Sequence, residues 1–523
     1  MAPPPRLPER AALRLLSAAD AACNRLYGSR WNPLYQSGSI VVALLAALIV
    51  TGLWLLLFYR VGAPYASVAR ISADPWVGSW IRGVHRYASD AAVVAVAVHA
   101  FRMFAQVRSW GPRALAWTTG VIMLALLYVC GLTGYVMVWD TFGHRVAQEG
   151  ARMLDALPIL SEPVGRAFTG EEALLGPFFF LNLFAHIAIP LGLGLVLWLH
   201  VSRVARPVLL PPRRVAVALL GALVAVSVAL PVRMQPEANP FRLPETVRMD
   251  VFFGFWLPLV RPLDGGVALV AVAVAGLALL LVPVATRRRG AVLPAPSVVD
   301  EDLCTGCRQC ALDCPYEAIT MVERAPGGRS AVVARVDPAL CVSCGICAGS
   351  CAPMAVGPPG RTGREQLPRV REMVASGEAG PGRTVVVCCE RGARGWGDTL
   401  AAVGAVVHPV DCTGSMHTSV VELLVRGGAS GVLVLSCPPS DCWNREGPRW
   451  MLERIYHDRE AELKARVDRR RVRVAYAAAS EELEALTALR SFMADTSRLP
   501  GGSAEHALVL EELCEQATVE ERA

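Results

Sequence analysis

The sequence predicts a multidomain protein: an all-α bundle of about six transmembrane helices, then a small α+β domain and a C-terminal α/β domain. Three observations lead to this fold class. Hydrophobic residues make up 54% of the 523 residues, charged residues only 18%, and the mean hydropathy is +0.41, as in membrane proteins. The long apolar runs lie before residue 290, whereas most of the 16 cysteines lie after residue 300. Beyond residue 384, short apolar strand-like runs alternate with helical stretches, which indicates an α/β domain.

Six apolar runs are long enough to be read as membrane spans, although the fifth is short. An even number of spans places both termini on the same side of the membrane. Arginine is dense at the N-terminus, after the second and fourth runs, and after the sixth, which predicts cytoplasmic termini. Cysteines with ligand-like spacing favour the same reducing side. The expected spans are Ser39–Tyr59, His85–Ala105, Leu115–Val138, Pro177–Val201, Val215–Val232 and Gly265–Ala285.

Composition divides the chain into seven expected segments. The net charge of +6 comes almost wholly from arginine and accompanies no nucleic-acid recognition motif, so nucleic acid is excluded as a partner. The segments are a cytoplasmic surface segment (1–38), a four-helix domain (39–210), two further helices with their connecting loop (211–290), a cysteine-framed domain (291–358), a linker (359–383), the α/β domain (384–495) and an acidic tail (496–523).

Four histidines recur at one interval inside the apolar runs. His85 and His99 are fourteen residues apart, as are His186 and His200. Fourteen residues is almost four helical turns, so each pair shares one helix face at a separation of about 21 Å. One such histidine could merely pair with a polar neighbour, but four at a repeated spacing indicate function, because polar groups in hydrocarbon are costly. Two helices of this kind can hold two stacked haems by bis-histidine ligation.

Glycines repeat the histidine interval on two helices that carry no ligand. The pairs are Gly38 with Gly52 and Gly120 with Gly134. Glycine is a common packing residue in membrane helices. The match to the histidine spacing favours a haem-facing role, because glycine leaves room for a flat macrocycle.

The membrane half resembles cytochrome b of the quinol-oxidising bc-type complexes, most closely the split version of chloroplasts and cyanobacteria. The resemblance covers residues ~25–285 and is carried by YQSGSI, TGLWLLLFYR, WIRGVHRYAS, HAFRM, TTGV, GLTGYVMVWD and LPIL. It implies that His85 and His186 bind an outer haem and that His99 and His200 bind an inner one. It also implies that Arg82 approaches a haem propionate, with an interfacial anchor as the alternative.

Two positions depart from that family. Gln36 stands where the split family has a cysteine that holds an extra haem covalently, so no third haem is expected. The family's Pro-Glu-Trp-Tyr signature for quinol oxidation is replaced by Met249-Asp250-Val251-Phe252. Asp250 keeps a carboxylate there and is a candidate proton acceptor for quinol. The alternative for Asp250 is a solvated loop carboxylate.

Eight cysteines form two complete ferredoxin-type runs, each of the form Cys-x-x-Cys-x-x-Cys-x-x-x-Cys. Such paired runs fold as a pseudo-symmetric domain with two 4Fe–4S clusters, and the fourth cysteine of each run ligates the other cluster. Zinc is the weaker alternative, because this double spacing is typical of clusters. The expected ligand sets are Cys304, Cys307, Cys310 and Cys351 for one cluster, and Cys341, Cys344, Cys347 and Cys314 for the other.

Five further cysteines follow predicted strands of the α/β domain. Ligands of parallel sheets bind at the carboxyl ends of the strands, so a metal cluster is favoured over buried structural thiols. This segment resembles the delta subunit of methyl-viologen-reducing hydrogenase, through DCTGS and RGGASGVLVLSCPPSDCW, and the resemblance implies a 2Fe–2S cluster. The family's first motif is Cys-x-x-Cys, so which four cysteines bind stays open among Cys388, Cys389, Cys412, Cys437 and Cys442.

These features predict a membrane-bound electron-transfer subunit. Its expected activity is that of an oxidoreductase subunit linked to quinone. Electrons would pass between the membrane quinone pool, two b haems, the clusters and a cytoplasmic flavin or iron–sulfur oxidoreductase of heterodisulfide-reductase or hydrogenase type. The resemblance to cytochrome b also implies a homodimer. One alternative is the cytochrome b of a complex with a Rieske protein that has gained cluster domains, and another is a redox-sensing or assembly subunit. The direction of electron flow stays open.

Overall fold

The computed structural model describes residues 6–159, 162–168, 175–202, 206–239, 241, 247–287, 294–325, 329–457 and 459–499. The chain divides into two compact units. The helical unit comprises Pro5–Ala12 and Gln36–Arg289, and the C-terminal unit comprises Met1–Pro4, Leu13–Tyr35 and Gly290–Ala523. The first helix, α1 (Leu7–Tyr27), contributes to both units.

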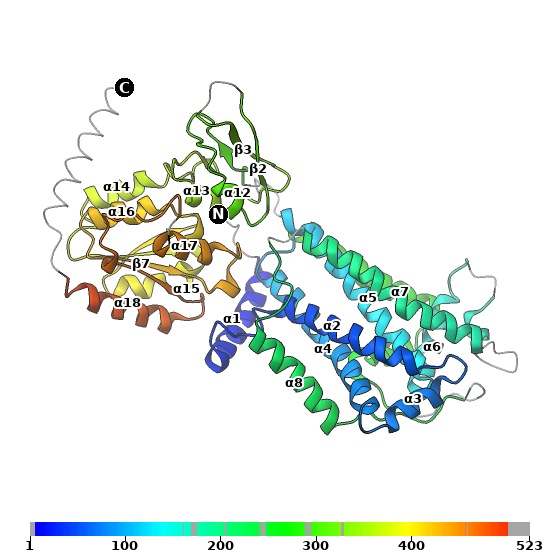
Figure 1. The fold of residues 1–523 in the computed structure, drawn as a ribbon. Helices are drawn as coiled ribbons and strands as arrows, with labels where there is room; N and C mark the ends of the chain where they lie inside the picture. Colours follow the sequence, from blue (N-terminus) through cyan, green and yellow to red (C-terminus); the bar gives the residue numbers. More distant parts are fainter. Residues whose placement is uncertain are drawn as a thin grey trace. The chain divides into compact units, whose positions relative to one another are not determined.

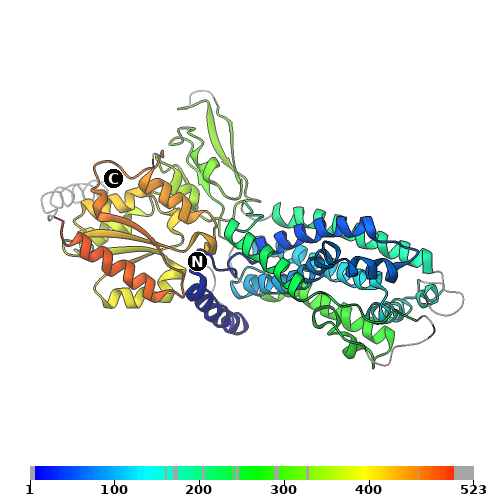
Figure 2. The ribbon, with the colours of Figure 1, turned by 60° about the horizontal axis from the view of Figure 1, so that its bottom comes forward.

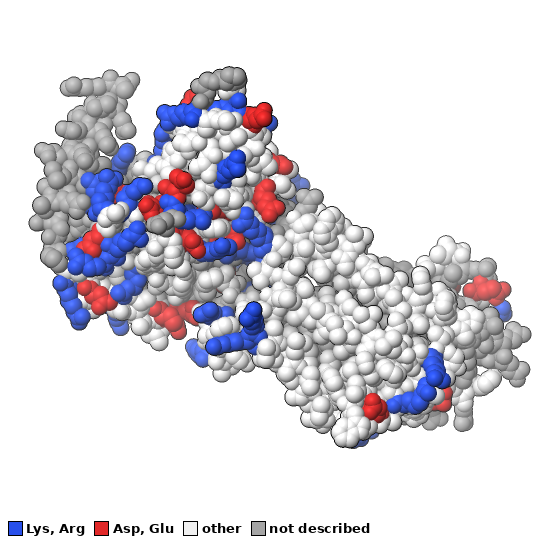
Figure 3. All heavy atoms as spheres, in the orientation of Figure 1, with Lys and Arg blue, Asp and Glu red and all other residues white. Residues whose placement is uncertain are grey.

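Within the described residues, five helices are long and apolar enough to cross a membrane. Their outer faces carry exposed leucines, such as Leu57 at 78% and Leu191 at 74%, which suit a hydrocarbon surrounding. Most of the visible face of this unit is free of charged side chains, and the charged ones gather toward one end (Figure 3). The five helices are α2 (Ser37–Phe58), α4 (Gly78–Ala105), α5 (Ala114–Val138), α7 (Leu175–Ser202) and α11 (Gly265–Thr286).

The expected span Val215–Val232 is not among the helices that are long and apolar enough to cross a membrane. The corresponding helix, α8 (Arg213–Ala229), has 17 residues and is about 26 Å long at 1.5 Å per residue, short of a hydrocarbon core of about 30 Å. It begins directly after Pro212 and ends at Leu230, where the backbone leaves the helical region before a proline. It packs along α4, and a Cβ on Gly83 would lie 2.8 Å from Cβ of Ser227.

Shorter helices cover one end of this bundle (Figures 1 and 2). The chain turns sharply into α6 (Thr141–Leu154) because the Asp140 carboxylate accepts hydrogen bonds from the amides of Phe142 and Gly143. The apolar face of α6 packs on Trp139 and Phe179 in one buried cluster. The other short elements are α3 (Pro64–Ala73), η1 (Gly111–Arg113), η2 (Val164–Ala167), α9 (Val251–Gly254) and α10 (Leu257–Val260).

The cysteine-framed part of the C-terminal unit is built as two similar halves. Each half has a short helix between its third and fourth cysteine, α12 (Gln309–Asp313) and α13 (Ile346–Ser350). The left-handed residues Gly306 and Arg308 of the first half have counterparts in Ser343 and Gly345 of the second. The strands are antiparallel pairs: β1 (Val298–Val299) with β4 (Val356–Gly357), and β2 (Ile319–Glu323) with β3 (Val332–Val336).

The last part is a three-layer α/β fold, which confirms the predicted class. Its four parallel strands have the order β6-β5-β7-β8, and both faces of β5 are buried because helices cover the sheet on each side (Figures 1 and 2). The strands are β5 (Thr384–Cys389), β6 (Val406–Val410), β7 (Gly431–Ser436) and β8 (Val472–Tyr476).

Two separate apolar cores hold these layers together. On one face, Val385 and Val387 pack with α14 (Leu367–Ala375), α16 (Thr418–Arg426) and α17 (Gly447–Tyr456). On the other face, Val386 packs with α15 (Glu390–Ala402) and α18 (Glu482–Thr496). The turns η3 (Thr413–Ser415), η4 (Pro439–Asp441) and η5 (Arg469–Arg471) connect these elements. The expected acidic tail lies outside the described residues from position 500 onward.

Candidate haem and iron–sulfur sites

The four histidines lie on two helices, as the spacing predicts, with His85 and His99 on α4 and His186 and His200 on α7. The imidazole rings of His85 and His186 face one another, with ring centroids 6.4 Å apart. Metal–imidazole bonds are about 2 Å long. Two such bonds in line, together with the two ring radii, span a distance of this size. The pair therefore suits one metal ion between the rings.

Each of the four glycines lies against one histidine ring. A Cβ on Gly52 would be 3.2 Å from Cε1 of His85, and one on Gly134 would be 3.0 Å from Cε1 of His186. Gly38 stands in the same relation to His99 at 3.0 Å, and Gly120 to His200 at 3.5 Å. The two glycines of α2 thus pack against the two histidines of α4, and the two glycines of α5 pack against the two histidines of α7. Their lack of a side chain lets the imidazoles lie against the neighbouring helix.

Each histidine ring also contacts a hydroxyl group, which belongs to the residue directly before the glycine that packs against that ring. The Nδ1 atoms of His85, His186 and His200 lie 2.9, 3.0 and 3.0 Å from the hydroxyls of Thr51, Thr133 and Thr119, respectively. Ser37 is 3.2 Å from Nδ1 of His99 in the same way.

The threonine hydroxyls also define the state of the imidazoles. Thr51 and Thr119 each donate to the carbonyl four residues earlier, and Thr133 donates to the carbonyl of Cys130. Because its own proton is used, each oxygen accepts from Nδ1–H of its histidine. Nε2 is then the unprotonated nitrogen, available to a metal. The residues present therefore fit a haem held by histidine Nε2 atoms, and when bound this group would supply one-electron transfer.

The two other predicted residues of the helical unit are engaged by protein groups. Arg82 donates to the carbonyl of Val232 at 2.8 Å. Asp250 caps α9, accepting from the amide of Phe253, and its carboxylate forms an ion pair with Arg86, the residue after His85. Its side chain is 12% exposed, so Asp250 is a partly buried carboxylate that is paired with an arginine. Arg86 also pairs with Asp90 on α4.

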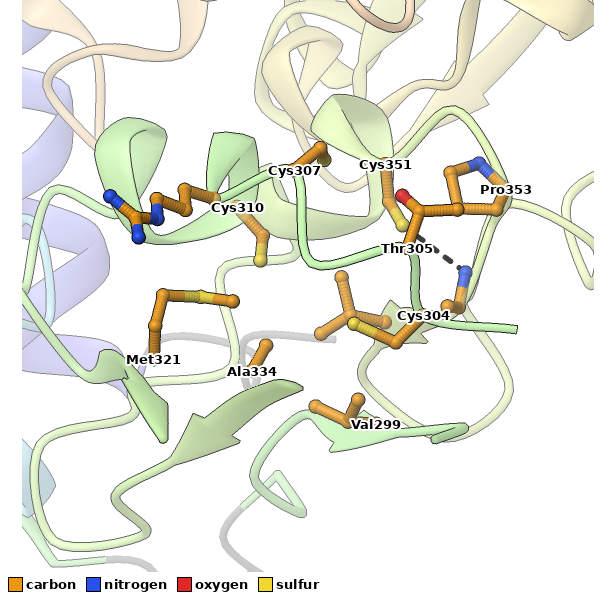
Figure 4. A pocket seen from close by; sticks show the side chains of 12 residues that line it. Val299, Cys304, Thr305, Cys307, Cys310, Met321, Ala334, Cys351 and Pro353 are labelled. Carbon is orange, nitrogen blue, oxygen red and sulfur yellow. Dashed lines mark hydrogen bonds between the residues drawn. The ribbon is translucent and has the colours of Figure 1, made fainter. Parts of the chain in front are cut away.

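The eight ferredoxin-type cysteines surround two cavities. Cys304, Cys307, Cys310 and Cys351 line one of about 320 Å³, together with apolar side chains such as Met321 and Val299. Figure 4 shows the thiols of Cys304, Cys310 and Cys351 turned toward this space. The second cavity, of about 290 Å³, is lined by Cys314, Cys341, Cys344 and Cys347. In both, the fourth cysteine of one run joins the first three of the other.

Burial favours the neutral form of the thiols that line these cavities. Burial raises the pKa of Cys347 to about 12 and also raises the pKa values of Cys310 and Cys344 well above the usual range. A bound metal reverses this effect by stabilising thiolates. Among the described residues, no three His, Cys, Asp or Glu side chains gather tightly enough for a single ion. The spread around a cavity therefore fits a cluster better than one zinc ion.

Backbone amides already point at several of these sulfur atoms. The amide of Ala355 donates to Cys351 Sγ at 3.2 Å, which is the dashed line in Figure 4. Ala318 donates to Cys314 Sγ at 3.4 Å, and the amide of Ser297 donates to Cys341 Sγ at 3.4 Å. Such bonds stabilise negative charge on sulfur and so affect the reduction potential of a bound cluster.

Four of the five cysteines of the α/β domain gather at the carboxyl edge of its sheet. Cys389 ends β5, Cys412 follows β6 and Cys437 follows β7, while Cys442 follows the turn η4. Parallel sheets bind ligands at this edge where the strand order reverses, here between β5 and β7.

Four of these thiols interact with one another, and Cys388 does not join them. A hydrogen bond with Cys437 lowers the pKa of Cys389 to about 7. Hydrogen bonds with Cys412 and then with Cys437 lower the pKa of Cys442 well below its ordinary value. Cys388 instead points into the α15–α18 core, where burial raises its pKa. Strand alternation explains the difference, because consecutive side chains of β5 point to opposite faces.

Gly447, at the start of α17, packs directly against two of these sulfur atoms. A Cβ there would lie 2.6 Å from Cys412 Sγ and 3.3 Å from Cys442 Sγ. The donor set of Cys389, Cys412, Cys437 and Cys442 therefore fits a cysteine-bound iron–sulfur cluster.

The sequence interpretation missed the residues that position these groups. The hydroxyls of Ser37, Thr51, Thr119 and Thr133 carry a readable signal, because each directly precedes one of the predicted glycines. Arg361 and Arg454, described below, carry no such signal.

Family models match three parts of the chain and confirm the three resemblances. Residues 23–206 match the model described as cytochrome b/b6/petB, residues 303–355 match a 4Fe–4S dicluster domain, and residues 385–499 match the delta subunit of methyl-viologen-reducing hydrogenase. The fold and the sites thus define a multi-pass membrane protein of electron transfer. More particularly, the chain joins a cytochrome b region, which implies haem, to domains that imply iron–sulfur clusters.

A solved structure titled "Hyperthermophilic respiratory Complex III" is similar to part of the chain. Its sequence identity is 17%, the match covers 48% of this chain and 75% of that chain, and the TM-score is 0.39.

Proposed function

We propose that the protein is a membrane electron-transfer subunit that connects the quinone pool to a soluble cytoplasmic oxidoreductase through two b haems and three iron–sulfur clusters. The observation that carries this proposal is that one chain holds both a histidine-paired helical bundle and cysteine-lined cavities. Each of these residue sets suits a one-electron carrier, and a chain of such carriers conducts between a membrane and a soluble partner.

In the membrane, His85 with His186 would hold the outer haem and His99 with His200 the inner one. The matched glycine and hydroxyl neighbours at all four histidines support two haems of equivalent construction. Gln36 at the place of the covalent cysteine supports no third haem.

In the cytoplasm, the cysteine sets of the two cavities would bind two 4Fe–4S clusters. The third cluster, 2Fe–2S by the family resemblance, would be held by Cys389, Cys412, Cys437 and Cys442, since Cys388 belongs to the apolar core. The delta-subunit match supports a heterodisulfide-reductase-type or hydrogenase-type partner. Because thiolate clusters suit a reducing compartment, both termini and the C-terminal unit would be cytoplasmic.

Asp250 is the candidate proton acceptor for quinol. Its carboxylate lies beside Arg86 and therefore close to His85 along α4. To accept a proton from quinol, the Asp250 carboxylate would have to leave its ion pair with Arg86.

The proposal is tested with the full-length protein in membranes. A quinol analogue should reduce the haems, as followed by their visible absorbance, and an added soluble acceptor should reoxidise haems and clusters together. Failure of quinol to reduce any haem contradicts the proposal. A strict requirement for a Rieske protein during turnover would favour the bc-complex alternative, and clusters that never change redox state would favour a sensing role.

A further inference from the structure

The ferredoxin-like domain and the α/β domain meet within the C-terminal unit along α13 and the turn η3. Glycine permits this close approach. A Cβ on Gly349 of α13 would lie 2.8 Å from the Met416 carbonyl oxygen and 2.9 Å from that of Gly414. A Cβ on Gly345 would lie 2.9 Å from Cβ of Ser415. Because η3 directly follows Cys412, this contact brings two cysteine motifs of different domains together.

A buried arginine crosses this contact. Arg454 of α17 is 1% exposed and donates through Nη1 to the Gly414 carbonyl at 2.8 Å. Through Nη2 it donates to the Ile346 carbonyl at 3.1 Å and to the Ser350 hydroxyl at 2.6 Å. Asp313, which precedes Cys314 and is also 1% exposed, lies 3.7 Å from Nη2 of Arg454 and forms a closer ion pair with Arg459, so its carboxylate faces two arginines. Burial lowers the pKa of Arg454 to about 10 and Asp313 opposes this, so the guanidinium stays charged at neutral pH.

A second arginine makes a parallel connection at the edge of the same contact. Arg361 donates through Nη2 to the Ser343 carbonyl at 3.1 Å and to the Ser343 hydroxyl at 2.8 Å. Its Nη1 forms an ion pair with Asp411, the residue before Cys412. Ser343 lies between Cys341 and Cys344. Arg361 therefore ties the same two motifs together as Arg454 does.

The contacts of the two arginines lie mainly beside one of the two cysteine-lined cavities. Ser343, Ile346 and Asp313 are all next to cysteines of the set Cys314, Cys341, Cys344 and Cys347. The other set makes fewer contacts across the boundary, namely Ser350 before Cys351 and the backbone of Cys351 beside His417.

We infer that Arg361 and Arg454 are positioning residues that join the Cys314–Cys341–Cys344–Cys347 set to the Cys389–Cys412–Cys437–Cys442 set, which makes these two sets consecutive in electron transfer. The inference rests on the proposed function. The step moves one electron: one set's cluster is oxidised as the other's is reduced, and no bond breaks and no proton moves.

The charge of the arginines has a further consequence. A buried cation between two centres stabilises the reduced, more negative form of both, because little water screens it. Removing that charge lowers both reduction potentials. The centre at Cys304, Cys307, Cys310 and Cys351 should respond less.

The test compares full-length variants by EPR-monitored redox titration, with iron and sulfide content as the assembly control. Arg454→Met and Arg361→Met remove charge, Arg454→Lys retains it, and Arg449→Met is the matched control, since Arg449 is an exposed residue of the same helix. Cys304→Ser and Cys341→Ser variants assign the two 4Fe–4S signals. In Arg454→Met we expect a tenfold decrease in the one-electron reduction equilibrium constant of the two joined centres, which is 59 mV. In Arg361→Met we expect a smaller decrease, because Arg361 is 34% exposed and paired with Asp411. We expect smaller shifts for Lys and none for the control.

Several results would overturn the inference. Unchanged potentials in both charge-removing variants, or the largest shift at the Cys304 centre, contradict it. If Arg454→Met fails to assemble its clusters, the more exposed Arg361→Met decides, because its side chain is 34% exposed and less needed for folding. A wild-type protein without cysteine-bound iron would instead overturn the proposed function, and this inference with it.

Discussion

Each of the four candidate haem-binding histidines is held by two consecutive residues of a neighbouring helix, a hydroxyl residue and a glycine. The glycine gives space and the hydroxyl gives direction. A hydrogen bond from Nδ1–H raises the basicity of Nε2 and fixes the plane of the ring. Because the arrangement is the same at all four positions, we infer that the four imidazoles have the same role.

The hydroxyl of Thr119 should influence the haem bound by His200. Thr119→Val removes one acceptor of the His200 Nδ1–H and leaves the Ala116 carbonyl, which makes Nε2 less basic and the oxidised iron less well stabilised. We expect a higher reduction potential and weaker haem retention, by about 10- to 100-fold in affinity. Redox titration and haem content measure both effects.

Thr118→Val is the matched control for that variant. Thr118 is the adjacent residue of α5, and its hydroxyl bonds only within its own helix, to the Ala114 carbonyl. An equal shift in both variants would mean that the potential responds to helix packing and not to the bond with His200.

Asp250 should affect quinol oxidation if it accepts the proton. Asp250→Asn removes the basic group while keeping the shape and a cap for α9. We expect the rate of quinol-driven haem reduction to fall by about 100-fold or more, as for the loss of a general base. Stopped-flow spectroscopy measures this rate, and dithionite-reduced spectra check that the haems are intact. An unchanged rate would leave Asp250 as a structural partner of Arg86.

Among the elements, β5 shows how strand geometry separates two identical neighbours. Cys388 and Cys389 are adjacent, yet one points into the core formed with α15 and α18 and the other toward the cysteines after β6 and β7. The period of two along a strand makes this unavoidable.

Substitution of these two cysteines should therefore have different effects. Cys389→Ala should abolish the third cluster, whereas Cys388→Ala should retain it, with a loss of about 1 kcal/mol or less in stability for a small buried thiol. Iron content and the EPR signal of the cluster provide the measurement. Loss of the signal in Cys388→Ala alone would reverse the assignment.

The helix α8 determines the topology of the whole molecule. If α8 crosses the membrane despite its 17 residues, there are six crossings and both termini lie on one side. The apolar Leu230 and Val232 after its end lengthen the apolar segment, and local thinning of the bilayer accommodates short spans at modest cost.

We therefore expect epitope tags at the two termini to be accessible from the same side, the cytoplasm. Antibody binding to sealed spheroplasts and to inside-out vesicles distinguishes the sides. A periplasmic loop tag serves as the control for sealing. Tags on opposite sides would show five crossings and would move the C-terminal unit or the N-terminus out of the cytoplasm.

Much of this protein could be read from local patterns in the sequence. Apolar runs, the interval of fourteen residues between His85 and His99, and the two ferredoxin-type cysteine runs each reflect a periodicity or ligand spacing within one short segment. Such patterns determined the α-helical membrane part, the two small domains and the choice of candidate residues. The end of α8 was misjudged because apolarity continues beyond the point where the helix stops.

Tertiary structure alone decided which groups meet. The pairing of Thr119 with His200, the division between Cys388 and Cys389 and the links made by Arg361 and Arg454 join residues far apart in the chain or distinguish neighbours by orientation. Arginines are frequent in this sequence, and nothing local marks Arg361, Arg454 and Arg459 as the ones that connect the two domains. Their partners are set by the packing of α13, η3 and α17, which depends on the whole C-terminal unit, and packing of that kind leaves no periodic trace in the sequence.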